Sequence, residues 1–188
     1  MTTSTTACLP STSIKPPSVN CNGTSWSPPP INSLKLNVDA HLIDDGRWAL
    51  GWIMRKSDGS CAGAGTKVLK GLNDVAMAEA SGLLEAMNWV ENQKLRNVIF
   101  ESDAATVVRA IQANSFPRTA WGQIAKNCAR VCDRNESYSV NWVSRVGNQS
   151  AHALARWAEV EPDKVWSFGP SCIQTHIQKD MGLVSPLV

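Results

Sequence analysis

Three short apolar segments follow one another early in the chain, and the dipeptide Asp58-Gly59 separates the last two. The segments cover residues 34–40, 48–54 and about 61–68. Each has the length of a strand. Asp-Gly between two such segments favours a hairpin, because a type I′ turn needs a positive φ at both central residues. The sequence therefore predicts three neighbouring strands joined by hairpins.

The first of these segments carries a carboxylate, Asp39, near its end. Apolar and polar residues alternate along it, which is the period of a strand with one buried face. Asp39 then belongs to the polar face. A single acid at the end of a strand is commonly a turn or cap residue, so a functional role for Asp39 depends on whether other acids converge on it.

From residue 73 the apolar spacing changes to that of a helix, which continues to about residue 92. Asn73 or Asp74 can cap its N-terminus. Glu79 lies one turn before Leu83, at the edge of the predicted buried face. Such a carboxylate either leans into solvent or needs a partner, since the transfer of a charge out of water is costly.

The rest of the chain alternates strands with helices. Residues 95–101 form a predicted strand whose continuous apolar centre indicates burial on both faces. Asp103 follows that strand, where it or Ser102 can cap the next helix. Helices are expected at residues 104–113, about 121–134 and about 150–160, with a strand at residues 137–143. Hairpin strands continued by helix-linked strands predict an α/β fold with a mixed sheet.

Length and composition indicate one globular domain. The chain has 188 residues, of which 43% are hydrophobic and 18% are charged, and both values are typical of a folded single domain. We expect this domain at residues 34–160. A flexible leader rich in Ser, Thr and Pro is expected at residues 1–33, and residues 161–188 form a tail without assigned structure. A net charge of +2 permits a polyanionic partner without requiring one.

The six cysteines contain no Cys-x-x-Cys pair, which argues against a disulfide framework. Cys128 and Cys132 lie on one apolar helical stripe, so core packing explains them better than metal binding. No apolar run approaches the ~18 residues that cross a membrane. We expect a soluble intracellular monomer in the nucleus or cytoplasm. A transit peptide is disfavoured because the leader lacks arginine.

Three acids share one predicted location, because Asp39 and Asp103 both follow strands and Glu79 lies in the first turns of a helix. In open sheets, sites gather beyond the carboxyl ends of the strands. Clustered carboxylates repel one another, and hard divalent ions such as Mg²⁺ take oxygen ligands. Two such ions about 4 Å apart can activate water and stabilise the leaving oxygen in phosphodiester cleavage. The third acid favours this chemistry over the two-acid chemistry of glycosidases.

Four short motifs together resemble the plant ribonuclease H-like domains related to those of reverse transcriptases. The motifs are Leu36-Asn37-Val38-Asp39, Ala78-Glu79-Ala80, Glu101-Ser102-Asp103 and residues 148–155. The likeness covers about residues 26–157. It implies the ribonuclease H fold, a five-stranded mixed sheet flanked by helices. It also implies a nucleic-acid partner, an RNA/DNA hybrid, and two Mg²⁺ or Mn²⁺ ions as cofactors.

Transferred residue by residue, the catalytic and metal-binding roles of active type 1 members fall on Asp39, Glu79, Asp103 and His152. The fourth position is an acid in those members, so His152 departs from their pattern. An imidazole is a poorer ligand for Mg²⁺ than a carboxylate and suits Mn²⁺ or Zn²⁺ better. His152 can alternatively pack or form a hydrogen bond at the start of the last helix.

Contacts to nucleic acid are less clearly marked in the sequence. Proteins that bind such hybrids follow the backbone of both strands, and Asn37, Lys35 and Arg145 are candidates for this contact. Each can equally be an ordinary surface residue. Two functions remain open: a metal-dependent endonuclease that cuts the RNA strand of RNA/DNA hybrids, and a catalytically degenerate nucleic-acid-binding or protein-interaction domain of retroelement origin.

Overall fold

The computed structural model of the protein describes residues 25–44, 46–71 and 74–183. The expected leader up to residue 24 and a cap at Asn73 lie outside these residues. The strands are β1 (Leu34–Asp44), β2 (Arg47–Arg55), β3 (Cys61–Lys70), β4 (Val98–Ser102), β5 (Tyr138–Trp142) and β6 (Val165–Trp166). The helices are α1 (Val75–Asn92), α2 (Ala105–Gln112), α3 (Ala120–Arg134), α4 (Gln149–Trp157) and α5 (Gln174–Asp180), with short 3-10 helices η1 (Arg145–Asn148) and η2 (Ser171–Ile173).

The strands form one mixed sheet in the order β5-β4-β1-β2-β3-β6. β1, β2 and β3 are antiparallel neighbours, as the hairpin pattern predicts, and β4 and β5 run parallel to β1. The expected count of five strands is one too low. The additional strand, β6, pairs with β3 through only two residues, which is too short to produce a periodic signal.

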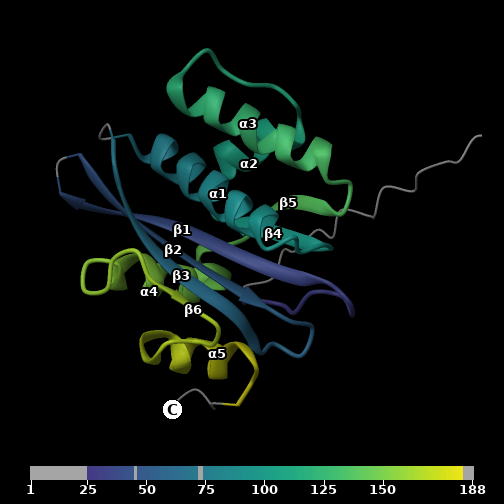
Figure 1. Cartoon of the computed structure of the whole chain (residues 1–188), viewed down its shortest axis with the longest axis vertical. Helices are drawn as coiled ribbons and strands as arrows, with labels where there is room; N and C mark the ends of the chain where they lie inside the picture. Colours follow the sequence, from purple (N-terminus) through teal and green to yellow (C-terminus); the bar gives the residue numbers. More distant parts are fainter. Residues whose placement is uncertain (1–24, 45, 72–73, 184–188) are drawn as a thin grey trace, which may run out of the picture.

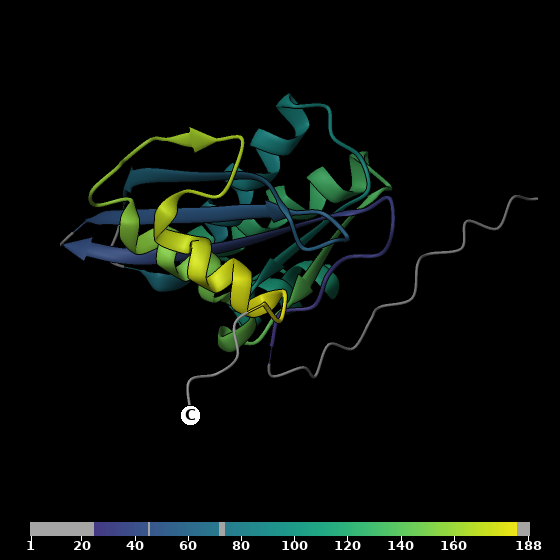
Figure 2. The ribbon, with the colours of Figure 1, turned by 90° about the horizontal axis from the view of Figure 1, so that it is seen from below.

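Helices cover both faces of the sheet. Figure 1 shows α1, α2 and α3 on one side and α4 and α5 on the other, and Figure 2 shows α5, in yellow, in front of the strands. The larger apolar core lies between the sheet and α1 to α3, and a smaller one lies beneath α4, η2 and α5. Consequently β1 is buried on both faces from Leu36 to Asp39, and the expectation of one polar face is wrong.

The turn between β2 and β3 differs from the expected type. Gly59 has a φ of +82°, whereas Asp58 is not among the residues with positive φ, so the turn is not type I′. The Gly59 amide donates to the Lys56 carbonyl at 3.0 Å. The Asp58 carboxylate accepts hydrogen bonds from the Ser60 amide at 2.9 Å and the Ser60 hydroxyl at 2.6 Å. A carboxylate bonded to the amide two residues on is an Asx turn.

Caps mark the starts of two long helices. The Asp74 carboxylate accepts from the Met77 amide at 3.2 Å, which confirms the expected cap of α1. Thr119 caps α3 in the same way. At α2 neither expected cap is used, because Ala104 occupies the N-cap position and Ser102 Oγ instead accepts from the Ala104 amide at 3.1 Å.

The predicted core role of the two cysteines on α3 is confirmed. Cys128 is completely buried, Cys132 packs against the same apolar cluster, and both thiols are free. Burial raises the pKa of Cys128 to about 12, which keeps this thiol protonated and unreactive. None of the described helices is both long and apolar enough to span a bilayer.

Both ends of the described chain pack on the sheet at Arg55, which is completely buried. Its guanidinium lies 3.5 Å from the centre of the Trp26 ring. Its Nη1 atom lies 2.5 Å from Asp180 Oδ2 at the end of α5. The described residues on either side, 25–33 and 161–183, therefore pack on the folded body.

Candidate metal centre

Three acids converge where the parallel pairing of β1 with β4 stops, at Val38 and Ser102. β1 itself continues to Asp44 along β2, so the expectation that Asp39 ends its strand is wrong. Asp39 lies on β1, Asp103 follows β4, and Glu79 projects from the second turn of α1. One carboxylate oxygen of each residue lies within 4.8 Å of the others, and Asp39 and Glu79 are buried. The structure thus brings together the three acids that the sequence placed at one site.

The fourth element of the centre, α4, packs directly against the backbone of β2. Gly51 pairs with Asp39 across the β1–β2 ladder. A Cβ atom at Gly51 would lie 2.1 Å from the Ala155 amide nitrogen and 2.6 Å from the Ala151 carbonyl oxygen. Only glycine permits this approach. The close packing brings His152, which lies between these alanines on α4, to Asp39.

The acids lie in surroundings that disfavour their charged forms. Burial, and then the charge of Asp103, raises the pKa of Asp39 to about 6, although the hydrogen bond from His152 acts in the opposite direction. Burial and the charges of Asp39 and Asp103 raise the pKa of Glu79 well above its ordinary value. A divalent cation would relieve both the repulsion and the desolvation, so this donor set fits Mg²⁺ or Mn²⁺.

His152 contacts the acids at one point only. Its Nδ1 atom lies 2.8 Å from Asp39 Oδ2, and 23% of its side chain is exposed. In the described part of the chain, the group of potential ligands within mutual reach contains Asp39, Glu79 and Asp103 without His152. The imidazole therefore borders the carboxylate group and orients its first acid.

Of the three residues expected to contact nucleic acid, Arg145, at the start of η1, is exposed. Its positive charge lowers the pKa of both Asp39 and Glu79. This effect is smaller than those of burial and of the neighbouring acids. Contact of Arg145 with nucleic acid stays a prediction.

Lys35 and Asn37 are buried, so their expected contact with nucleic acid is wrong. Lys35 Nζ lies 2.7 Å from Glu101 Oε1, and Asn37 Nδ2 donates to Glu101 Oε2 at 3.0 Å. Trp26 Nε1 donates to Asn37 Oδ1 at 3.0 Å. The segment before β1 covers this face, which the alternating pattern of β1 alone does not reveal.

Two further residues at the centre were not identified from the sequence. Asn148, which is buried, donates from Nδ2 to the Val38 carbonyl at 3.0 Å and contacts Asp103 Oδ1 at 3.5 Å. Trp142, which is 42% exposed, donates from Nε1 to the Asp103 carbonyl at 3.2 Å. The position of Asn148 one turn before His152 could have indicated that it lies at the centre. The sequence around Trp142 contains no such indication.

This architecture is similar to that of known proteins. The family model described as reverse transcriptase-like matches residues 37–158. No curated protein matches the chain. Among solved structures, ribonuclease H1 from Halobacterium salinarum NRC-1 is 20% identical with a TM-score of 0.61, and the match covers 69% of this chain and 98% of that one.

Two further solved structures agree with this match. The N-terminal ribonuclease H domain of rv2228c from Mycobacterium tuberculosis, solved as a fusion with maltose-binding protein, is 17% identical with a TM-score of 0.56 and covers 69% of this chain and 96% of that one. LC11 ribonuclease H1 in complex with an RNA/DNA hybrid is 16% identical with a TM-score of 0.57 and covers 65% and 93%. These likenesses show the ribonuclease H fold. Because the family model matches well over half of its length, the chain belongs to the reverse transcriptase-like family.

Proposed function

We propose that this protein binds RNA/DNA hybrids and cleaves their RNA strand as a metal-dependent endonuclease. The observation that carries this proposal is the convergence of Asp39, Glu79 and Asp103 within 4.8 Å, with raised pKa values for Asp39 and Glu79. Carboxylates held together against their mutual repulsion are suited to bind cations. The fold supports the same reaction class, because a likeness was found to a ribonuclease H1 in complex with an RNA/DNA hybrid.

The residues of the centre have two kinds of role, metal binding and the positioning of the metal-binding acids. Asp39, Glu79 and Asp103 would hold Mg²⁺ or Mn²⁺, and His152 is the candidate for a ligand to a second ion. When bound, two such ions activate a water molecule and stabilise the leaving oxygen of a phosphodiester. Asn148 links Asp103 to Val38 of β1 through its contacts at 3.0 and 3.5 Å. His152 holds Asp39 through Oδ2.

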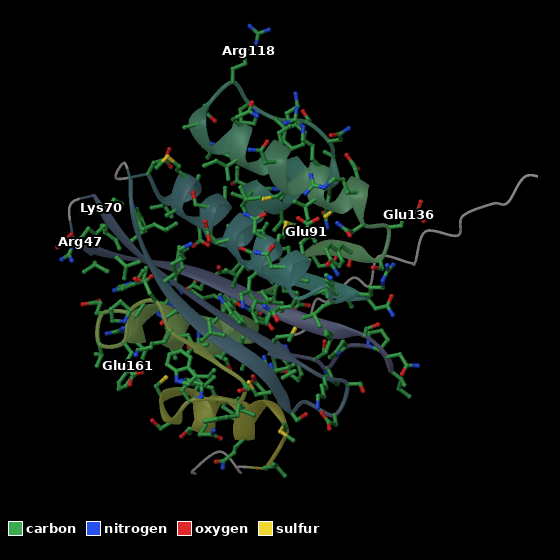
Figure 3. The ribbon with its side chains drawn as sticks, in the orientation of Figure 1. Arg47, Lys70, Glu91, Arg118, Glu136 and Glu161 are labelled. Atoms are coloured by element: carbon green, nitrogen blue, oxygen red, sulfur yellow. The ribbon has the colours of Figure 1, made fainter. Side chains whose placement is uncertain are left out.

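Arg145 is our candidate for contact with a phosphate beside the reacting bond, because it is exposed and lies on η1, directly before the helix that carries His152. Other basic side chains lie farther along α3 and the loop before it. Figure 3 shows Arg118 at the tip of that loop, directed away from the body of the protein. Arg134 forms an ion pair with Glu91 at 3.0 Å. We expect modest affinity that falls as salt increases.

The test is cleavage of a labelled RNA/DNA hybrid by the full chain with Mg²⁺ and, separately, with Mn²⁺. We expect cuts in the RNA strand that the Asp39→Asn variant does not make. Asp133→Asn is a matched control, because Asp133 lies on the exposed surface of α3 and its replacement leaves the centre intact. Equal cleavage by wild type and Asp39→Asn would falsify the enzymatic proposal.

One observation favours a second function, namely a domain that binds hybrids without cutting them. His152 occupies the position at which active type 1 members carry an acid, and it lies outside the mutually close ligand group. The loss of one negative charge weakens the binding of a second Mg²⁺ ion. Salt-sensitive binding of the hybrid that is weakened by Arg145→Ala, without turnover in either metal, would support this function.

A further inference from the structure

We propose that Trp142 is a base-stacking site beside the three acids, and that the protein therefore prefers RNA/DNA hybrids whose RNA carries an unpaired nucleotide next to the bound phosphate. The inference rests on the proposed function and deepens it, because it names the part of the substrate that lies beside the acids. Trp142 has no part in the motifs that indicate the family. Its position at the centre follows from the structure.

Trp142 differs from the other tryptophans in its exposure. All eight tryptophans lie within the described residues, and every one except Trp142 is buried or half-buried. Trp142 also belongs to neither apolar core. An aromatic side chain whose faces meet solvent is the surface on which nucleobases stack in proteins that bind single-stranded nucleic acid.

The exposure of Trp142 arises where the larger core ends. Tyr138, Val140 and Trp142 alternate along β5 and therefore share one face of the sheet. Tyr138 and Val140 are buried in the larger core. Trp142 occupies the last position of the strand and is exposed. Packing of the core therefore does not account for this aromatic side chain.

Two hydrogen bonds hold Trp142 beside one of the acids. Its Nε1 atom donates to the Asp103 carbonyl at 3.2 Å, and the next amide, that of Val143, donates to the Ser102 carbonyl at 3.1 Å. The Nε1–H bond uses the edge of the indole, which leaves its faces for other contacts. Within residues 25–44, 46–71 and 74–183, neither an aromatic ring nor a cation stacks on Trp142.

The stacking partner of Trp142 must be a base with an uncovered face. Inside a duplex, neighbouring bases cover both faces of each base, whereas the bases of loops, bulges and ends are free to stack on aromatic side chains. Successive phosphates of one strand advance by ~3.4 Å along the helix axis, so a phosphate bound at the acids brings the adjacent nucleotide to the residues around Asp103. An unpaired RNA nucleotide at the end of a hybrid fits this arrangement.

The experiment measures binding of the full chain to two labelled substrates by fluorescence anisotropy. One is a blunt RNA/DNA hybrid, and the other is the same hybrid with a short single-stranded RNA extension. Ca²⁺ replaces Mg²⁺, and a gel verifies that both strands stay uncut. Wild type should bind the extended hybrid more tightly than the blunt one. Trp142→Leu should weaken binding of the extended hybrid by about 5- to 150-fold and leave binding of the blunt hybrid nearly unchanged.

Two comparisons separate stacking from a structural role of the side chain. Trp142→Phe loses the same hydrogen bond to Asp103 as Trp142→Leu but keeps an aromatic ring, so it should retain most of the preference. A 2-aminopurine at the first unpaired RNA position should lose fluorescence when wild type binds and keep it when Trp142→Leu binds. Phe168→Leu is the matched surface control. Phe168 is exposed and follows β6, at the opposite edge of the sheet from β5, so both affinities should stay unchanged.

Two results would overturn the inference. The first is equal affinity of wild type and Trp142→Leu for the extended hybrid. The second is equal weakening of both substrates by Trp142→Leu, because the contact would then not be with an unpaired base. In either case a chain that still binds the blunt hybrid refutes the stacking site alone. Failure of wild type to bind either hybrid at low salt would refute the proposed function as well.

Discussion

Replacement of Gly51 by alanine tests how α4 is held against the sheet. The added Cβ atom would lie 2.1 Å from the Ala155 amide nitrogen and 2.6 Å from the Ala151 carbonyl oxygen. These are backbone atoms of a helix, which cannot rotate away as the end of a side chain can. We therefore expect α4 to move outward as a unit, which lengthens the contact between His152 and Asp39.

The size of the effect follows from these contacts. Overpacking of a core costs about 1–3 kcal/mol, and occasionally more. The clash at Gly51 involves backbone only, so we expect a loss of ~3 kcal/mol in the free energy of unfolding. For a domain of this size, each kcal/mol lowers Tm by about 2–4 °C. The variant should therefore melt roughly 6–12 °C below wild type.

The measurement is thermal and urea unfolding of Gly51→Ala beside the matched variant Gly63→Ala. A Cβ at Gly63, on the adjacent strand β3, would meet its nearest atom, Cη2 of Trp89, at 3.5 Å. This is ordinary van der Waals contact, so Gly63→Ala should change Tm little. If Gly51→Ala unfolds at the same temperature as Gly63→Ala, α4 does not pack on β2 as described, and the reasoning about His152 fails with it.

Three further predictions concern the interior. The pKa of Asp39 is raised to about 6 from an ordinary 3.8, so between pH 4 and 6 the folded metal-free chain retains a proton that the unfolded chain has released. The stability that this group contributes is therefore present at pH 4 and is lost as pH rises through 6, by about 3 kcal/mol. In urea titrations, the stability of Asp39→Asn relative to wild type should rise between pH 4 and 6. Asn148→Ala should lower the free energy of unfolding by about 1–3 kcal/mol, because the Val38 carbonyl loses its buried donor; an unchanged urea midpoint would contradict this role. Asp180→Asn leaves the buried Arg55 charge without its partner and should cost about 3–5 kcal/mol, whereas an equal Tm for wild type and variant would show that the pair contributes nothing.

The convergence of the acids could be predicted from the order of the elements. Asp39 and Asp103 come directly after Val38 and Ser102, the last pair in the parallel ladder of β1 and β4, and sites gather where parallel strands end. The location of Glu79 at the edge of the buried face of α1 could be predicted from the helical period alone. These three positions depend on local patterns, and local patterns are what a single sequence records most directly.

The residues whose surroundings the sequence did not predict are positioned by contacts between segments that are distant in sequence. Lys35 and Asn37 alternate with apolar neighbours as surface residues do, but Glu101 and the segment containing Trp26 enclose them. His41 gave no signal at all, because its proximity to His152 arises only when α4 packs on Gly51. Such tertiary contacts bury residues that the alternation of apolar and polar residues along β1 predicts to be exposed, and the alternation itself gives no sign of it.

The stacking of Trp26 and the ion pair of Asp180 on Arg55 determine where this protein can be shortened. Two guanidinium nitrogens, Nε and Nη2, are buried without a hydrogen-bond partner, so the side chain depends on the ring above it and the carboxylate beside it. A fragment limited to residues 34–160 would retain every acid of the centre and lose both of these contacts. Fragments intended for binding or cleavage studies should therefore begin before Trp26 and extend beyond Asp180.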